Sequence, residues 1–263
     1  MDKRPIGVFD SGVGGLSVLK ELQRLLPNEN FIFLADQLYV PYGEKSKRQL
    51  INLSHRITDY FLTRDIKLMV IACNTATCHT IDSLRKKYQL PIVGTVPAVK
   101  SAAEKTRTGV IAVISTPATA KSQALKKLIR NHCRNVTVLN IGCKNLEDAV
   151  ENGKSDESEI SKLLEKYLKP VRQSEADHLV LGCTHYPFLK NTLKKFVRPS
   201  ARIIDSGPAI ARQTESLLIN HSIKNTKKGR GTTSYLTTGD AAKFSTVVEH
   251  LLGKPIKARM VKI

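Results

Sequence analysis

Two short cysteine-bearing stretches, Met69–Thr77 (MVIACNTAT) and Leu179–Pro187 (LVLGCTHYP), decide how this chain is organised. Each is an apolar run that is broken by one cysteine and then continues with small hydroxyl or amide residues. The apolar part is short and rich in Val, Ile and Leu, which is typical of a buried parallel strand. Open parallel sheets place their ligand sites at the carboxyl ends of the strands, where Cys73 and Cys183 fall. The two stretches therefore predict one site that is built from two halves.

Strands and helices alternate around these stretches. In the first part of the chain the pattern predicts strands at 5–10, 31–34, 68–72 and 91–94, with helices at about 16–26, 47–64 and 80–88. The pattern restarts with a strand at 109–115 and a helix at about 121–131, and it continues with strands at 136–141, 179–182 and 202–205. Such alternation predicts an α/β fold with mainly parallel sheets flanked by helices. The similar layout of the two parts indicates an internal duplication and hence two pseudo-symmetric domains.

The last part of the chain has no counterpart in the second copy. It contains a predicted helix at 209–220, a strand at 234–237 and a helix at about 242–252. We expect this tail to return to the first domain and to make it discontinuous. The predicted domains are therefore residues 1–97 plus 208–263, and residues 98–207, the second of which includes an acidic helical stretch at about 146–169.

The net charge of the chain is compatible with a nucleic-acid-binding protein or with an enzyme for a small anionic substrate. Lys and Arg number 42 against 23 Asp and Glu, which gives a formal net charge of +19. Such an excess occurs in nucleic-acid-binding proteins. Here the basic residues are dispersed and no aromatic-rich basic block accompanies them, so a solvated surface that attracts a small anionic substrate is favoured. Specific nucleic-acid binding stays as a remote alternative.

The chain shows no membrane or secretion signal. No apolar run approaches the roughly 20 residues that a membrane span requires. The N-terminal MDKRP passes directly into an apolar strand, without the long apolar region of a signal peptide. We therefore expect a cytoplasmic protein without membrane contact.

The cysteine count argues against a disulfide framework. There are five cysteines, an odd number in a chain without a secretion signal. No CxxC pair occurs, and the Cys-His pairs are not spaced like zinc ligands, so no metal is expected. Because buried cysteine is usually a small core residue, that interpretation suits Cys78, Cys133 and Cys143.

A glycine-rich turn, Ser11–Gly15, follows the first predicted strand. With Asp36 downstream it resembles a dinucleotide-binding fingerprint, but Ser17 stands at the third glycine position and Asp10 would oppose a pyrophosphate. A purely structural turn is one alternative. The favoured hypothesis is a small-ligand site, in which Ser11 and backbone N–H groups at a helix start bind an anion. No cofactor is expected.

Cys73 and Cys183 differ from the other cysteines because each ends a strand and precedes an expected helix N-terminus. A helix N-terminus lowers a thiol pKa from its usual value of about 8.5 and makes a thiolate available. Two opposed thiols can move a proton at a stereocentre: one removes it from one face, and the other delivers a proton to the opposite face. His185 and Asp10 could relay these protons, or they could be a core hydrogen-bonding residue and a turn cap.

Four motifs in order along the chain resemble those of the glutamate racemase family. They are Phe9–Leu16 (FDSGVGGL), Pro41–Gly43 (PYG), Ala72–Ala76 (ACNTA) and Gly182–Pro187 (GCTHYP). Three further stretches also fit that family: Val96–Ala98, Asp205–Gly207 and Thr237–Asp240. Any one motif could be accidental, but their combination at matching positions covers essentially the whole chain.

The resemblance implies a cofactor-independent racemase with its active site in the interdomain cleft. In this scheme Cys73 deprotonates D-glutamate and Cys183 deprotonates L-glutamate, assisted by Asp10 and His185, with Glu151 as a further candidate. The resemblance also implies a substrate-binding set: Asp10, Ser11, Tyr42, Gly43, Asn74, Thr75, Thr184 and His185. It further implies that the product, D-glutamate, feeds peptidoglycan synthesis, and we expect a homodimer. The alternatives are an aspartate racemase or another cysteine-dependent isomerase on the same fold.

Overall fold

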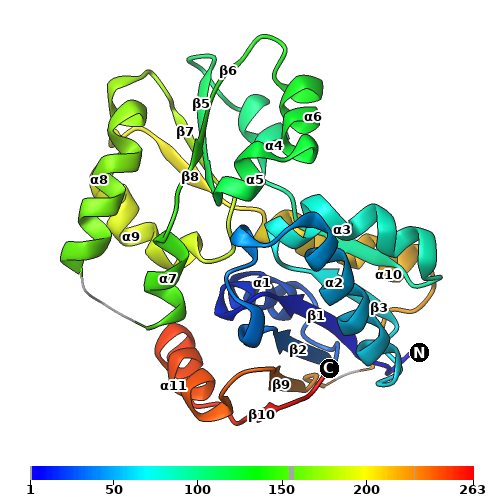
Figure 1. Cartoon of the computed structure of the whole chain (residues 1–263). Coiled ribbons are helices and arrows are strands. Elements are labelled where there is room, and N and C mark those ends of the chain that lie inside the picture. Colours follow the sequence, from blue (N-terminus) through cyan, green and yellow to red (C-terminus); the bar gives the residue numbers. More distant parts are fainter. Residues whose placement is uncertain (1, 154–156, 228) are drawn as a thin grey trace.

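Two parallel β-sheets form the framework of the computed structural model (Figure 1), which describes residues 2–153, 157–227 and 229–263. The larger sheet has the strand order β10-β9-β2-β1-β3-β4. Its strands are β1 (Ile6–Asp10), β2 (Phe31–Ala35), β3 (Leu68–Ile71), β4 (Ile92–Gly94), β9 (Thr233–Thr237) and β10 (Ala258–Met260). The smaller sheet has the order β6-β5-β7-β8, with β5 (Val110–Ser115), β6 (Thr137–Gly142), β7 (His178–Leu181) and β8 (Arg202–Ile204).

The two sheets repeat one topology. The order β2-β1-β3-β4 in the larger sheet matches β6-β5-β7-β8 in the smaller, and every strand pairing is parallel. The predicted α/β class with two parallel sheets is therefore confirmed. The tail supplies β9, which pairs with β2, and β10, which pairs with β9 at the edge of the larger sheet. The short edge strand β10 was not predicted. The domain boundaries at 97/98 and 207/208 stay a prediction.

Helices cover both sheets (Figure 1). Those in the sequence segments of the larger sheet are α1 (Leu16–Leu25), α2 (Lys47–Leu62), α3 (Asn74–Lys87), α10 (Gly207–Asn220) and α11 (Ala241–Leu252). Those in the segments of the smaller sheet are α4 (Val99–Ala103), α5 (Pro117–Lys121), α6 (Gln123–His132), α7 (Leu146–Glu151), α8 (Glu157–Gln173) and α9 (Lys190–Leu193). Short 3-10 helices are η1 (Val13–Gly15), η2 (Gln37–Tyr39), η3 (Tyr42–Glu44), η4 (Tyr186–Leu189) and η5 (Lys194–Phe196).

The second half departs from prediction at two helices. The helix expected at about 121–131 is α6, which begins at Gln123 because Ser122 is extended and its hydroxyl accepts the Leu125 N–H. The short helix α5 that precedes it was not predicted. The acidic stretch expected at 146–169 contains α7 and α8, and its residues 154–156 lie outside the described residues.

Alternation along the strands divides the core. Ile6 and Val8 of β1 pack in one hydrophobic cluster with the leucines of α1, whereas Phe9 packs in another cluster with α2 and α3. The first cluster also includes Leu146 and Val150 of α7, so it continues from the larger sheet into the second half of the chain. Each fully buried aliphatic side chain stabilises the fold by about 1.5–3 kcal/mol. The two halves are therefore held by a shared core as well as by the chain.

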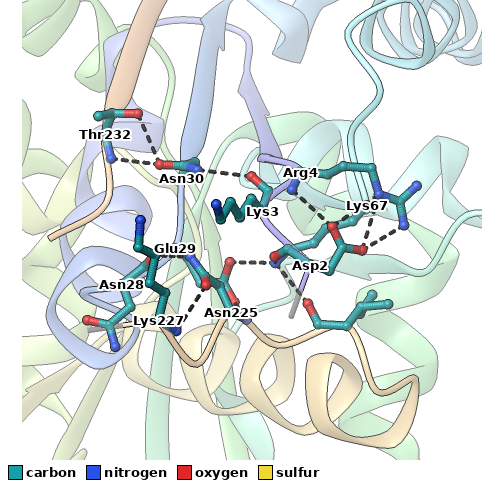
Figure 2. Close-up of polar contacts among 11 residues, drawn as sticks. Asp2, Lys3, Arg4, Asn28, Glu29, Asn30, Lys67, Asn225, Lys227 and Thr232 are labelled. Carbon is teal, nitrogen blue, oxygen red and sulfur yellow. Dashed lines mark hydrogen bonds and ion pairs between the residues drawn. The ribbon is translucent and has the colours of Figure 1, made fainter. Parts of the chain in front are cut away.

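At the amino end of the larger sheet a buried ion pair joins distant segments (Figure 2). Lys67, just before β3, lies with its Nζ 2.6 Å from Oε2 of Glu29, just before β2, and both side chains are at most 2% exposed. The same Nζ donates to the carbonyls of Asp2 (2.7 Å) and Ile223 (2.8 Å), while Oε1 of Glu29 accepts the Asn225 N–H. We call Asp2, Glu29, Asn30, Lys67 and Asn225 the amino-edge cluster.

Among the described residues, no helix combines the length and the apolar character needed to cross a membrane.

Candidate active site

One pocket collects the residues that follow the central strands of both sheets. Of the ten predicted site residues, nine line it: Ser11, Tyr42, Gly43, Cys73, Asn74, Thr75, Cys183, Thr184 and His185. Asp10 is fully buried and does not line the pocket. The two cysteine stretches thus meet, as expected for a site of two halves.

Cys73 lies between the end of β3 and the start of α3. It is the N-cap residue of α3, and its Sγ accepts the Ala76 N–H at 3.5 Å. The Ser11 hydroxyl is 3.7 Å from the same sulfur. The helix predicted at 80–88 begins earlier, at Asn74, so a helix N-terminus does face this thiol.

Cys183 follows β7 but does not precede an α-helix. The chain turns at once through i→i+3 hydrogen bonds, with the Tyr186 N–H bonded to the Cys183 carbonyl, and it then forms the short 3-10 helix η4. The expected helix N-terminus is therefore wrong for this thiol. Its charged neighbour is His185, whose Nδ1 lies 3.5 Å from the Cys183 Sγ.

Burial raises the pKa of both site thiols. Each side chain is 6% exposed, and loss of water disfavours the thiolate. The Asp10 carboxylate adds to this at Cys73, and His185 opposes it at Cys183, without reversing the direction. The expectation of lowered thiol pKa values is therefore wrong, because desolvation outweighs a helix N-terminus or one nearby cation.

Asp10 ends β1 and connects the two halves. Its Oδ1 accepts the Gly12 N–H at 2.9 Å, and its Oδ2 accepts the Thr184 hydroxyl at 3.0 Å. Burial raises the pKa of Asp10, although His185 and the Gly12 N–H oppose this. The carboxyl caps the glycine turn, which was one predicted alternative, and also positions Thr184 beside Cys183. Its assistance to Cys73 stays a prediction.

His185 forms a buried ion pair with Glu151 of α7. The His185 Nε2 is 2.7 Å from Oε1 of Glu151. Burial lowers the pKa of His185, but the Cys183 sulfur and the Glu151 carboxylate outweigh it and hold this pKa well above its ordinary value. Burial likewise raises the pKa of Glu151, but its bond to His185 outweighs burial and keeps it below the usual range. Both directions favour an imidazolium paired with a carboxylate.

The glycine turn holds the protein's own carboxylates. The Val13 N–H donates to Glu151 Oε1 at 2.6 Å, and the Gly12 N–H donates to Asp10. In this structure these donors are occupied, so the anion that we expected at the turn is supplied by the chain itself. A Cβ on Gly14 would lie 2.5 Å from the His185 Nδ1, which explains why glycine is needed at this close approach.

Several predicted binding residues have partners within the protein. The Tyr42 hydroxyl donates to Asp36 at 2.6 Å, so Tyr42 lines the pocket while its hydroxyl is already bonded. Burial, together with the Asp36 carboxylate, raises the pKa of Tyr42 well above its ordinary value. The Thr75 hydroxyl lies 3.0 Å from that of Thr116.

Sequence reasoning missed Thr116 and Glu147, which also line the pocket. The internal duplication carried a signal for Thr116, because it follows β5 as Ser11 follows β1. No sequence signal distinguished Glu147 from the other acidic residues of its stretch.

Within the described ranges, no group of three or more His, Cys, Asp or Glu residues is arranged to hold a metal ion. The pocket instead has two buried thiols at equivalent strand ends, with an ion-paired histidine beside one of them. This arrangement is the one expected for an enzyme that uses two thiols as acid and base between two similar α/β halves.

Comparison with known proteins gives the family. Residues 6–214 match the model of the Asp/Glu/Hydantoin racemase family. A glutamate racemase from Herpetosiphon aurantiacus is 40% identical over 247 residues, covering 94% of this chain and 97% of that protein. The chain therefore belongs to the Asp/Glu racemase family and, within it, to the glutamate racemases.

Solved structures agree with this assignment. A glutamate racemase isoform from Bacillus anthracis has a TM-score of 0.93 at 30% identity, covering 100% of this chain and 99% of that one. A glutamate racemase from Francisella tularensis in complex with D-glutamate has a TM-score of 0.86 at 29% identity, covering 100% and 98%.

Proposed function

We propose that this chain interconverts L-glutamate and D-glutamate by a two-thiol acid/base mechanism that needs no cofactor. The observation that carries the proposal is the position of Cys73 and Cys183, which follow equivalent strands and line one pocket. Family membership supplies the substrate, because the curated relatives are glutamate racemases.

The reaction moves one proton at each face of the α-carbon. The Cys183 thiolate removes the α-hydrogen of L-glutamate, so an S–H bond forms while the C–H bond breaks. The electron pair stays on the α-carbon and its carboxylate. The Cys73 thiol then gives its proton to the opposite face, which produces D-glutamate and leaves Cys73 as the thiolate. The reverse reaction starts from that state.

The site must make thiolates available despite their burial. An α-ammonium bound between the thiols places a cation beside both sulfurs, and a nearby cation lowers a thiol pKa. The excluded water also strengthens the hydrogen bonds that stabilise the carbanion. Ser11, Gly43 and Asn74 line the pocket and supply donors for the two substrate carboxylates. Thr184 also lines it and offers its backbone N–H, because its hydroxyl donates to Asp10.

The Glu151–His185 pair assists the Cys183 half of the reaction. An imidazolium 3.5 Å from the Cys183 sulfur stabilises the thiolate that takes the proton from L-glutamate. Asp10 acts on Cys73 in the other half, where burial and a raised pKa favour a carboxyl group that can hold a proton. His185 and Asp10 therefore control protonation at Cys183 and Cys73, respectively.

The biological setting follows from the family. We propose that D-glutamate made here enters peptidoglycan synthesis. All five cysteines, each among the described residues, are free thiols, which suits the cytoplasm that we propose as the location, because a reducing compartment keeps both site thiols reduced. The predicted homodimer is tested by light scattering on the purified protein, where a monomer mass would contradict it.

The test is proton NMR of L-glutamate in D₂O with purified, reduced, metal-chelated protein and no added cofactor. Loss of the α-proton signal together with a fall of optical rotation to zero is the expected result. An unchanged signal with glutamate and turnover of aspartate would replace this proposal with aspartate racemase. Absence of turnover with salt-sensitive DNA binding would favour the nucleic-acid alternative.

A further inference from the structure

Glu147 on α7 is a buried carboxyl without a hydrogen-bond partner on one oxygen. The residue is 8% exposed, and its Oε2 is buried with no partner among the described residues. It lines the active-site pocket together with Cys183, Thr184 and His185. A buried acceptor that is left unpaired costs about 1–3 kcal/mol, so its presence needs an explanation.

The other two carboxylates of the site are already saturated. Asp10 accepts from the Gly12 N–H and the Thr184 hydroxyl. Glu151 accepts from Val13, Gln37 and His185. Neither of these two carboxylates lines the pocket, so Glu147 is the one carboxylate that does so within the described part of the chain.

An α-amino acid brings a matching group to this pocket. Its ammonium carries three N–H donors and one positive charge, and a buried ammonium requires acceptors. The Thr75 and Thr116 hydroxyls of the lining bond to each other, and the Thr184 hydroxyl is committed to Asp10. The free carboxylate oxygen of Glu147 is therefore the strongest acceptor offered to the substrate.

We propose that the Glu147 carboxylate accepts a hydrogen bond from the α-ammonium of the substrate and thereby selects α-amino acids over dicarboxylic acids that lack the amino group. This inference rests on the proposed function, because it takes glutamate as the molecule in the pocket. It assigns to α7 a second carboxylate role, distinct from that of Glu151: Glu147 binds substrate, whereas Glu151 holds His185.

The surroundings of Glu147 disfavour its negative charge unless a cation lies beside it. Burial raises the pKa of Glu147, and the neighbouring carboxylates of Asp148 and Glu44 raise it further, while His185 lowers it. The Cys183 thiolate is also destabilised by a charged Glu147. An ammonium placed between Glu147 and Cys183 stabilises the negative charge on both groups, so substrate binding favours thiolate formation and the reverse.

The test compares Glu147→Gln with the wild type, using glutamate and its desamino analogue glutarate. The variant keeps the side-chain shape and removes the charge. We expect its KM for L- and D-glutamate to rise about 10- to 100-fold, because a charge-assisted hydrogen bond is lost. The inhibition constant of glutarate should stay the same or fall, because glutarate has no ammonium to lose and no longer meets a negative charge.

Asp148→Asn is the matched control. It removes one carboxylate charge from the neighbouring position of α7, and Asp148 does not line the pocket. The KM for glutamate and the inhibition constant of glutarate should both stay at their wild-type values. Glu147→Asp keeps the charge on a shorter side chain and should retain part of the preference for glutamate over glutarate.

Two results would overturn the inference. Equal losses for glutamate and glutarate in Glu147→Gln would mean a merely structural role, and unchanged constants would mean no contact with substrate. If Glu147→Gln does not fold, the same comparison is made with Glu147→Asp. Equal losses of glutamate and glutarate binding in that variant would also mean a merely structural role. Failure of the proposed function is seen separately, as a wild-type protein that does not exchange the α-proton of glutamate.

Discussion

The two ends of the larger sheet hold buried charges in opposite ways. At the amino ends of the strands, Lys67 has three partners for its three donors: Glu29 and the carbonyls of Asp2 and Ile223. At the carboxyl ends, Cys73 has only long contacts to its sulfur, and Glu147 across the pocket has an oxygen without a partner. The amino ends of these strands therefore hold a lysine whose donors all have partners, whereas the pocket at their carboxyl ends includes a carboxyl oxygen of α7 without a hydrogen-bond partner.

This difference separates stability from function. A buried lysine whose three donors are all occupied offers nothing to a ligand. The pocket keeps Cys73, Cys183 and Glu147 out of water, and this burial raises their pKa values until a charged substrate arrives. Substitutions at the two ends should therefore change different measurements, as the following predictions state in order of decreasing effect.

Cys73→Ser and Cys183→Ser should each lower racemisation by about 10³-fold or more, because a serine hydroxyl is far too weak an acid to replace a thiol in proton transfer. Optical rotation measures the loss, and the melting temperature should change little. Cys73→Ser should still exchange the α-proton of L-glutamate in D₂O, and Cys183→Ser that of D-glutamate. Near-normal racemisation by either variant contradicts the two-thiol mechanism, and Cys78→Ser is the control.

Lys67→Met should lower the free energy of unfolding by about 3–5 kcal/mol, because it leaves the Glu29 carboxylate buried without its cation. Urea denaturation measures this loss. Turnover per folded molecule should stay unchanged, because the pair lies at the opposite end of the strands from the thiols. The double variant Glu29→Leu with Lys67→Met should recover part of the stability, because no charge stays buried while the Asp2 and Ile223 carbonyls and the Asn225 N–H lose these partners. A double variant as unstable as the single one would show that the buried charge is not the cause.

Glu151→Gln should lower the free energy of unfolding by about 1.5–3 kcal/mol, the range for hydrogen bonds to charged groups. The folded pKa of His185 is raised, so its contribution is full below about pH 6.5 and is lost as pH rises through the folded value. The folded pKa of Glu151 is lowered, so its contribution is full above about pH 4.5 and is lost as pH falls through the folded value. The difference from wild type should therefore be largest between about pH 4.5 and 6.5.

Denaturation of both proteins across this pH range measures the difference. A difference that is constant from pH 4 to 9 would contradict the charged pair. Asp148→Asn on the same helix serves as the control and should show no such pH dependence.

Asn30→Ala should cost about 1 kcal/mol, since Asn30 contributes exposed neutral hydrogen bonds to the amino-edge cluster. It joins the Lys3 carbonyl to the Thr232 N–H (Figure 2). Urea denaturation should show this small loss, with KM and kcat unchanged. A loss as large as that of Lys67→Met would mean that the exposed contacts, and not the buried pair, hold this edge.

Sequence reasoning predicted the fold well because its signals were local or repeated. Apolar runs ending at Cys73 and Cys183 place both thiols at strand ends, and the repeated strand–helix order predicts two similar sheets. It failed where tertiary burial decides the outcome. The thiol pKa values depend on water exclusion by both halves, and the turn after Cys183 depends on hydrogen bonds that no periodicity reveals.

The acidic residues of α7 show the same limit. Glu147 and Glu151 lie one helical turn apart and look alike in sequence, yet one is unpaired in the pocket and the other is bonded to His185 and to the glycine turn. Their different roles follow from which segment packs against each, and this requires the folded chain.

The shielding of the two site cysteines turns ordinary thiol reagents into reporters of pocket occupancy. Cys73 and Cys183 are each 6% exposed and line the pocket, so alkylation should be slower at these two thiols than at the partly exposed Cys78. Bound glutamate should slow the labelling of Cys73 and Cys183 much more than that of Cys78. The sulfurs that the reaction needs are in this way also sheltered from oxidants between turnovers.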